Sequence, residues 1–222
     1  MQVDIFTLFP EWFEWFRGQR HVANALGAGS DLRCFHWRDT TPLTGGQVDD
    51  SPYGGGAGMV LRVDVVDAAL EAAYGEDDRP GRVILMTPSG RQFDEALAVE
   101  LAAEPRIALL CGRYEGVDER VREHLATDAV SVGPYVLAGG ELAAMVVADA
   151  VMRKLPGALG HADSALEESF SEALEGGLEY PHYTRPANYR GWEVPEVLRS
   201  GDHARVREWR LARSRARRAP ER

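Results

Sequence analysis

The chain has 222 residues, 25 Lys and Arg against 35 Asp and Glu, a net charge of −10 and two cysteines, Cys34 and Cys111. This length fits one large domain, alone or with a small second one. Two cysteines exclude a disulfide scaffold or a cysteine-rich zinc module, and we expect no disulfide partners. The apolar runs are too short to span a bilayer, and the N-terminus lacks the basic segment of a signal peptide. We therefore expect a soluble cytoplasmic protein that contacts no membrane.

The N-terminal part begins with two expected strands, residues 3–8 and 32–37. Residues 49–59 form a glycine-rich loop with neither a strand nor a helix period. A helical pattern follows over residues 63–74. Three later segments share one plan, in which a short apolar run leads into a glycine-containing loop and then a helical pattern. The expected strands are 83–87, 107–111 and 129–132, their loops are 88–90, 112–116 and 133–140, and the helical patterns are 93–101, 117–125 and 141–154.

Apolar runs without alternation, each followed by a helix, predict buried parallel strands in an α/β sheet. Ligands of such sheets bind beyond the carboxyl ends of the strands, so we expect the three loops to converge on one site. Glycines in these loops would let a ligand lie against backbone groups without obstruction by a Cβ atom. For any single loop, the alternative is a glycine that only turns the chain.

The C-terminal part has a different composition. Periodicity lapses over residues 161–169, which predicts a linker, and residues 170–222 predict a small domain ending in an arginine-rich helix over 203–218. Residues 180–186 contain too much proline for regular structure. Between residues 199 and 222, nine arginines stand against three acidic residues, a local charge of +6, which leaves −16 on residues 1–198. A basic end on an acidic body predicts a polyanionic partner, and a solvated terminus is the alternative.

Several common site signatures are absent from the sequence. The glycines at 54–58 are not followed by Lys and Ser or Thr, so they form no P-loop, and no G-x-G-x-x-G opens a helix after the first strand. There is no H-E-x-x-H, no paired C-x-x-C and no G-x-S-x-G. The six histidines are scattered, so we expect no metal site built from histidine and cysteine.

Long motifs point to one family. They are DDSPYGGGAGM at 49–59, LLCGRYEGVDERV at 109–121, SVGPYVLAGGEL at 131–142, YPHYTRP at 180–186 and GWEVPEVLRSGDH at 191–203. Together they closely resemble the bacterial tRNA (guanine-N1)-methyltransferase family, TrmD. The resemblance runs in order from IFTLFP at 5–10 to REWR at 207–210, nearly the whole chain.

The resemblance implies a methyltransferase of the SPOUT class, with a parallel sheet whose C-terminal part is threaded into a trefoil knot. It implies an obligate homodimer with each active site at the subunit interface. The reaction implied is transfer of a methyl group from S-adenosylmethionine to N1 of guanosine 37, beside the anticodon of tRNA. The resemblance also implies three parts, an S-adenosylmethionine-binding domain over 1–160, a linker over 161–169 and a small helical tRNA-binding domain over 170–222.

The resemblance carries the cofactor role onto the three loops. The residues concerned are Thr87, Pro88, Ser89, Gly90, Gly112, Tyr114, Glu115, Val132, Gly133, Pro134, Tyr135, Val136, Leu137, Gly139 and Gly140. Such a set would supply an apolar slot with backbone donors and acceptors for adenine. Glu115 would place a carboxylate near the sulfonium, and a Mg²⁺ dependence of the family has been placed around it. The alternative for Glu115 is an acidic residue at a helix N-terminus.

The reaction requires a base for the guanine N1 proton and a cation for the charge that develops on O6. By resemblance these are Glu168 and Arg153. The alternatives are Glu167 as the base and, for Arg153, an i,i+4 pair with Asp149. Arginines expected at the tRNA surface are Arg113, Arg185, Arg213 and Arg215.

The sequence departs from the family pattern at two places. Many relatives have Asp where this chain has Pro134, and the presumed general base of the family is an Asp where this chain has Glu168. Three additional residues precede YPHYTRP. Two competing functions are therefore weighed, a catalytically inactive RNA-binding module that keeps the fold and a SPOUT enzyme acting on ribosomal RNA. The intact cofactor loops argue against the first, and YGGG with PHYTRP against the second.

Overall fold

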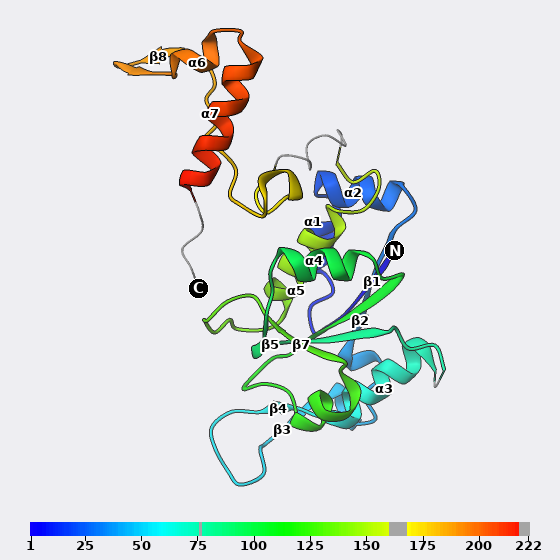
Figure 1. Ribbon diagram of the computed structural model, residues 1–222. Helices are drawn as coiled ribbons and strands as arrows, with labels where there is room; N and C mark the ends of the chain where they lie inside the picture. Colours follow the sequence, from blue (N-terminus) through cyan, green and yellow to red (C-terminus); the bar gives the residue numbers. More distant parts are fainter. Residues whose placement is uncertain (76, 160–167, 218–222) are drawn as a thin grey trace. The chain divides into compact units, whose positions relative to one another are not determined.

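The computed structural model describes residues 1–75, 77–159 and 168–217 (Figure 1). The chain divides into two compact units, Met1–Gly160 and His161–Arg222, and each is described by itself. Of the expected linker over 161–169, only residues 168 and 169 fall within the described part of the chain.

The first unit contains a five-stranded sheet in which every paired strand runs parallel to its neighbour, in the order β2-β1-β6-β5-β7. Its strands are β1 (Gln2–Thr7), β2 (Asp31–His36), β5 (Arg82–Gln92), β6 (Arg106–Cys111) and β7 (Asp128–Ser131). Ile5 of β1 pairs with Cys34 of β2 on one side and Leu109 of β6 on the other. The parallel sheet with its helices confirms the expected α/β fold class.

Helices cover both faces of this sheet. On one face lie α1 (Trp12–Arg17), α2 (Arg20–Gly27), α4 (Glu95–Ala102) and α5 (Glu141–Met152), and on the other lies α3 (Val63–Tyr74) (Figure 1). Along β6, Ile107, Leu109 and Cys111 join the core of the first face, whereas Ala108 and Leu110 join that of the second. Because both faces are buried, the strand reads as a continuous apolar run rather than an alternating one.

β5 is longer than the sequence predicts. We expected a strand over 83–87 and a loop over 88–90, but β5 continues to Gln92. Met86 and Arg91 both pair with Val130 of β7, so the four residues between them leave the ladder and return to it. The sequence prediction ended the strand too early because Pro and Gly usually end a strand, whereas here the strand continues beyond them. Helix α4 then begins after Asp94, whose side chain accepts a hydrogen bond from the Leu97 N–H at 2.9 Å.

The segment after β6 was predicted correctly only in part. Instead of a helix over 117–125, two helical residues, Glu119 and Arg120, lead into a π-helical turn, Val121–Leu125. The preceding residues are engaged by the glycine-rich loop, because Glu115 N–H donates to Met59 O and Leu61 N–H donates to Gly116 O, each at 3.0 Å. That loop carries short strands missed from the sequence, β3 (Asp49–Asp50) paired antiparallel with β4 (Val60–Leu61).

In its described part, the second unit consists of four short elements and one helix of 14 residues. They are a 3-10 turn (Glu172–Leu174), β8 (Asn188–Tyr189), β9 (Trp192–Glu193), α6 (Glu196–Arg199) and α7 (His203–Ala216). Asp202 caps α7 by accepting hydrogen bonds from the N–H groups of Ala204 and Arg205. Residues 180–186 contain no regular element, as their prolines predict.

Neither cysteine of the chain is in a disulfide. Across the described residues, no helix has both the length and the apolar character needed to cross a membrane.

Candidate functional site

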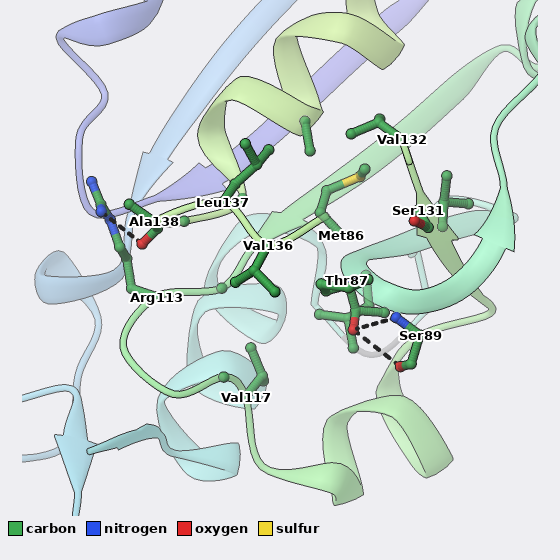
Figure 2. Close-up of a pocket in the computed structure, with 18 of the residues that line it drawn as sticks. Met86, Thr87, Ser89, Arg113, Val117, Ser131, Val132, Val136, Leu137 and Ala138 are labelled. Carbon is green, nitrogen blue, oxygen red and sulfur yellow. Dashed lines mark hydrogen bonds between the residues drawn. The ribbon is translucent and has the colours of Figure 1, made fainter. Parts of the chain in front are cut away.

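A cavity of about 200 Å³ opens where β5, β6 and β7 end or leave the sheet (Figure 2). Its walls come from the excursion in β5, the loop after β6 and the loop after β7, so the expected convergence of three loops is confirmed. Parallel strands end at a common edge, which is why segments far apart in sequence meet here. All but Gly90 and Pro134 of the residues predicted to bind the cofactor line this cavity.

The β5 excursion forms one wall. The hydroxyl groups of Thr87 and Ser89 lie 3.2 Å apart, and Arg122 Nη1 donates to Ser89 Oγ at 3.3 Å. Gly90 does not line the cavity, but a glycine is required at this position because the chain passes close to β7. A Cβ atom on Gly90 would lie 2.4 Å from the backbone carbon of Ala129, so only glycine lets the excursion return against β7.

The loop after β6 is held by Arg113. Its Nη1 donates to the Ala138 carbonyl at 2.9 Å, its Nε lies 3.5 Å from Glu141 Oε2, and its guanidinium carbon lies 4.4 Å from the Phe9 ring centroid. Glu141 is 1% exposed, and Thr7 Oγ1 donates to its other oxygen at 2.9 Å. A buried carboxylate needs such partners, because burial without them is costly. The Arg113–Glu141 ion pair, with Thr7, therefore joins the loops after β6 and β7 to β1.

This arrangement gives Arg113 a different setting from the one expected of an RNA contact. Its side chain is 18% exposed and is directed to the Ala138 side of the cavity, opposite Thr87 and Ser89 (Figure 2). Its Nη1 donates to Ala138, and its buried Nε faces the Glu141 carboxylate. We therefore interpret Arg113 as a residue that positions the loops.

Tyr114 and Glu115 form the outer part of the same loop. Tyr114 adopts φ 60, an uncommon left-handed conformation for a residue with a side chain, and such strain is typical of functional sites. Burial and the neighbouring Asp49 carboxylate raise the pKa of the Tyr114 phenol. Gly58 of the glycine-rich loop, with φ +80, lies so close to Glu115 that a Cβ atom there would come within 2.3 Å of Glu115 Cγ. The glycine-rich loop therefore lies against the rim of the cavity.

The loop after β7 supplies the third wall. The Ser131 hydroxyl donates to the Gly133 carbonyl at 3.0 Å and starts the turn. Leu137 packs against the core, whereas Val136 is 86% exposed at the cavity. A Cβ atom on Gly140 would lie 2.7 Å from the Cα atom of Cys111, so glycine permits the start of α5 to cross the end of β6.

The cavity combines apolar walls, backbone groups of glycine-containing loops and charged side chains, the carboxylates of Glu115 and Glu119 and the guanidinium groups of Arg113 and Arg122. Such a lining suits a flat apolar group with polar edges that carries both a positive and a negative charge. Within the described parts of the chain, no three His, Cys, Asp or Glu side chains gather in a metal-binding arrangement. A Mg²⁺ site around Glu115 stays a prediction.

The two predicted catalytic residues lie in different units. Arg153 directly follows α5 and does not line the cavity. Its i,i+4 neighbour Asp149 has its Oδ1 2.8 Å from His21 Nε2. Glu168 is half-buried in the second unit, where its carbonyl accepts from the Ser171 N–H at 3.0 Å. Glu167, the alternative base, lies outside the described residues.

The remaining predicted RNA contacts belong to the second unit. Arg185, Arg213 and Arg215 are exposed. Arg213 lies 5.6 Å from the Trp209 ring centroid, and Arg215 lies 3.6 Å from Glu175 in an exposed pair. Exposed pairs of this kind are weak, so these guanidinium groups stay available to phosphates.

Sequence reasoning missed several lining residues. Lining residues outside the three expected loops include Met86, Val117, Glu119, Arg122, Ser131 and Ala143. Glu141 was not singled out although it anchors Arg113. The position of Glu141, directly after Gly139-Gly140, is the only signal the sequence offers for it.

Comparison with known proteins agrees with this geometry. The chain matches the family tRNA (Guanine-1)-methyltransferase TrmD over residues 1–222. It is 52% identical over 217 residues to a tRNA (guanine-N(1)-)-methyltransferase of Brevibacillus brevis, covering 96% of this chain and 86% of that protein. It is 49% identical over 215 residues to the protein of that name in Dehalococcoides mccartyi, covering 96% and 86%, respectively. A third relative of that name, from Bacillus cereus, is 50% identical over 211 residues, covering 95% and 85%. The chain belongs to the tRNA (guanine-1)-methyltransferase family, TrmD.

Proposed function

We propose that this enzyme transfers a methyl group from S-adenosylmethionine to N1 of guanosine 37 in tRNA, in the cytoplasm. The observation that carries the proposal is the cavity formed by the excursion in β5 and the loops after β6 and β7. It lies where parallel α/β sheets bind nucleotides, and it has the lining that an adenosine with a charged sulfonium requires.

The residues present fit S-adenosylmethionine. Gly112, Gly139 and Gly140 bring backbone close to the cavity, and Leu137 with Met86 offers apolar surface for an adenine. Glu115 would stabilise a positive sulfonium by its charge. When bound, the cofactor supplies an electrophilic methyl group. Pro134, which replaces the Asp of many relatives, does not line the cavity, so its substitution leaves the lining intact.

Residues of the chain would then remove the proton of guanine N1 and stabilise the negative charge that develops on O6. Guanine N1 carries a proton at neutral pH, and we assign its removal to the Glu168 carboxylate. The negative charge that spreads to O6 would be stabilised by the Arg153 guanidinium, which stays protonated at any working pH. Glu168 is one methylene longer than the Asp of relatives, which extends the reach of its carboxylate by about 1.5 Å.

The position of Arg153 supports a homodimer. Helix α5 begins at the cavity and has twelve residues, so Arg153 is about 18 Å farther along its axis, beyond the reach of a side chain into the cavity of the same chain. A second copy would have to bring its Arg153 to this cavity. Leu142 and Val146, four residues apart on α5, are 52% and 49% exposed and offer an apolar surface for that copy.

The dimer has its own test in light scattering. Val146→Glu should give monomers without methyl transfer, whereas Val146→Thr, similar in shape, should stay dimeric and active. An active monomer would contradict the proposal.

We also infer a trefoil knot in the first unit. Gly140 crosses the end of β6 with its N–H bonded to the Gly112 carbonyl at 2.8 Å, and α5 then packs against β1 and β6. This crossing, which only glycine permits, supports a chain that passes through the loop after β6.

The tRNA partner is assigned to the second unit. Its exposed arginines on α7 and in the segment before β8 suit a phosphate backbone, and binding should weaken with rising salt.

The decisive experiment measures methyl transfer from labelled S-adenosylmethionine to tRNA transcripts with guanosine or adenosine at position 37, with ribosomal RNA fragments as a control. We expect label only in the guanosine transcript, recovered as 1-methylguanosine after nuclease digestion. No transfer would indicate an inactive RNA-binding protein, and label in ribosomal RNA would indicate a different target. Either result would overturn the proposal.

A further inference from the structure

The hairpin formed by β8 and β9 is a well-defined structure at the edge of the second unit. Its turn residues, Arg190 and Gly191, have φ values of 54 and 85, the pair of positive angles of a type I′ turn. Asn188 Nδ2 donates to Glu193 Oε1 at 3.0 Å, and Gly191 N–H donates to Asn188 Oδ1 at 3.1 Å. In Figure 1 the hairpin (orange) projects away from α6 and α7. The local hydrogen bonds therefore fix its shape without a core beneath it.

The two strands present an aromatic pair to solvent. Tyr189 and Trp192 are cross-strand partners whose rings lie 5.8 Å apart at 60°, an edge-to-face arrangement. They are 49% and 70% exposed. The contact between the rings holds each in place while leaving ring faces open. Exposed aromatic pairs on a rigid support are typical of binding surfaces.

The arginine beside the pair favours an anionic partner, in a segment, residues 185–199, whose three arginines stand against Glu193 and Glu196 for a net charge of +1. The Arg190 guanidinium lies 5.1 Å from the Tyr189 ring centroid, within the range of a cation–π contact. Exposed Arg185 precedes the hairpin, and exposed Arg199 ends α6. An Arg beside stacked aromatic rings is the combination that binds single-stranded nucleic acid, where bases stack on the rings and guanidinium groups meet phosphates.

The size of the hairpin favours a nucleobase over a protein partner. A stable protein interface buries about 800 Å² on each side, far more than four strand residues present. A nucleobase needs only one ring face. A second copy of this chain is the alternative occupant, and the experiment below separates it.

We propose that an unpaired base of tRNA stacks on the Tyr189–Trp192 pair while Arg190 contacts a neighbouring phosphate. This rests on the proposed function, since it takes tRNA as the substrate, and it assigns part of the binding free energy to a named surface. Stacking on aromatic rings tolerates any base, so the hairpin should add affinity without selecting guanosine 37.

The experiment uses the full chain and measures the dissociation constant for the tRNA transcript by fluorescence anisotropy at several salt concentrations. Trp192→Ala should raise it about tenfold with an unchanged salt slope, because stacking releases no counterions. Trp192→Phe should restore most of the affinity. Arg190→Ala should reduce the salt slope by about one. Leu211→Ala, which removes an exposed apolar side chain from α7 of the same unit, is the matched control and should bind as wild type.

Three further measurements keep the outcomes distinct. The circular dichroism of Trp192→Ala must match that of the wild type, and if it does not, Trp192→Leu, which keeps an apolar side chain but removes the ring face, carries the test and should also bind about tenfold more weakly. Unchanged affinity in Trp192→Ala, or dissociation of the dimer instead of weaker tRNA binding, would overturn the proposal. A transcript with adenosine 37 should lose methylation but keep the effect of the hairpin. Loss of methyl transfer in the wild type with the hairpin effect intact would overturn the proposed function alone.

Discussion

The interactions that stabilise the interior of the first unit differ from those that stabilise the interior of the second. Residues 1–160 bury two apolar clusters, one on each face of the sheet, with residues such as Ile5, Leu109 and Leu70 fully excluded from solvent. In the described part of the second unit, only Leu174, Tyr180 and the polar Ser214 are buried.

The second unit relies on polar contacts instead. Ser214 Oγ donates to the Leu178 carbonyl at 2.7 Å, and the Arg210 guanidinium lies 4.7 Å from the Tyr180 ring centroid. Burial of a large apolar side chain contributes about 1.5–3 kcal/mol, whereas a hydrogen bond contributes about 1 kcal/mol net. We infer that the second unit is the less stable of the two.

Truncating one core residue in each unit tests this difference most directly. Leu109→Ala should lower the free energy of unfolding of the first unit by about 2–5 kcal/mol, because a cavity forms at a fully buried site. Leu174→Ala should leave that unit unaffected and weaken only α7. Hydrogen exchange resolved by peptide measures both units, and tRNA should raise protection in α7. Equal protection of the β6 and α7 peptides in the wild type would contradict the comparison.

Substitution of Glu168 tests whether a residue of the second unit takes part in methyl transfer. Glu168→Gln should lower turnover at least about 100-fold, because an amide accepts no proton from guanine N1, while the affinity for S-adenosylmethionine stays unchanged. Glu168→Asp should keep much of the activity. Glu175→Gln, an exposed acid of the same unit, is the control. Near wild-type turnover in Glu168→Gln would make Glu167 the next residue to examine.

A glycine substitution tests the rigidity of the first unit. Gly140→Ala places a Cβ atom 2.7 Å from the Cα atom of Cys111, and the backbone must move to relieve it. Overpacking of this kind costs about 1–3 kcal/mol. A loss of that size from the free energy of binding would weaken the affinity for S-adenosylmethionine about 5- to 150-fold, which calorimetry measures. Gly27→Ala, whose Cβ atom meets nothing within 4 Å, should bind normally. Normal binding by Gly140→Ala would show that the loops after β6 and β7 adapt.

The smallest expected effect concerns a thiol of the first unit. Burial raises the pKa of Cys34 from 9.0 to about 11. The unfolded thiol loses its proton at lower pH than the folded one, so Cys34 stabilises the fold fully below pH 9 and loses this contribution as pH rises toward 11. Thermal midpoints between pH 8 and 10.5 should therefore fall less steeply for Cys34→Ala. Parallel curves would indicate that the folded thiol is more hydrated than its setting suggests.

The sequence predicted most of what local patterns encode. Apolar runs revealed the parallel strands because both faces of the sheet are buried, and the bounds of α3 were predicted as observed. The convergence of the three loops could be predicted because parallel strands end at the same edge of their sheet. The short helices α1 and α2 were not predicted.

Contacts between distant segments were beyond local patterns. The glycine-rich loop pairs with the segment after β6, and Glu141 meets Thr7 across 134 positions of sequence. A glycine in the sequence can indicate that there is no room for a Cβ atom, but it does not indicate which neighbouring atom occupies that space. The roles of Glu168 and Arg153 rest on the family resemblance alone, because neither lines the cavity.

The excursion in β5 has a consequence for the thermodynamics of ligand binding. Met86 and Arg91 both pair with Val130, so the intervening residues form a closed loop of four whose ends are already joined. The entropy of closing this loop is lost when the protein folds and not when a ligand arrives. A ligand therefore meets a wall that is organised in advance, and its affinity is not reduced by the entropy of closing this loop.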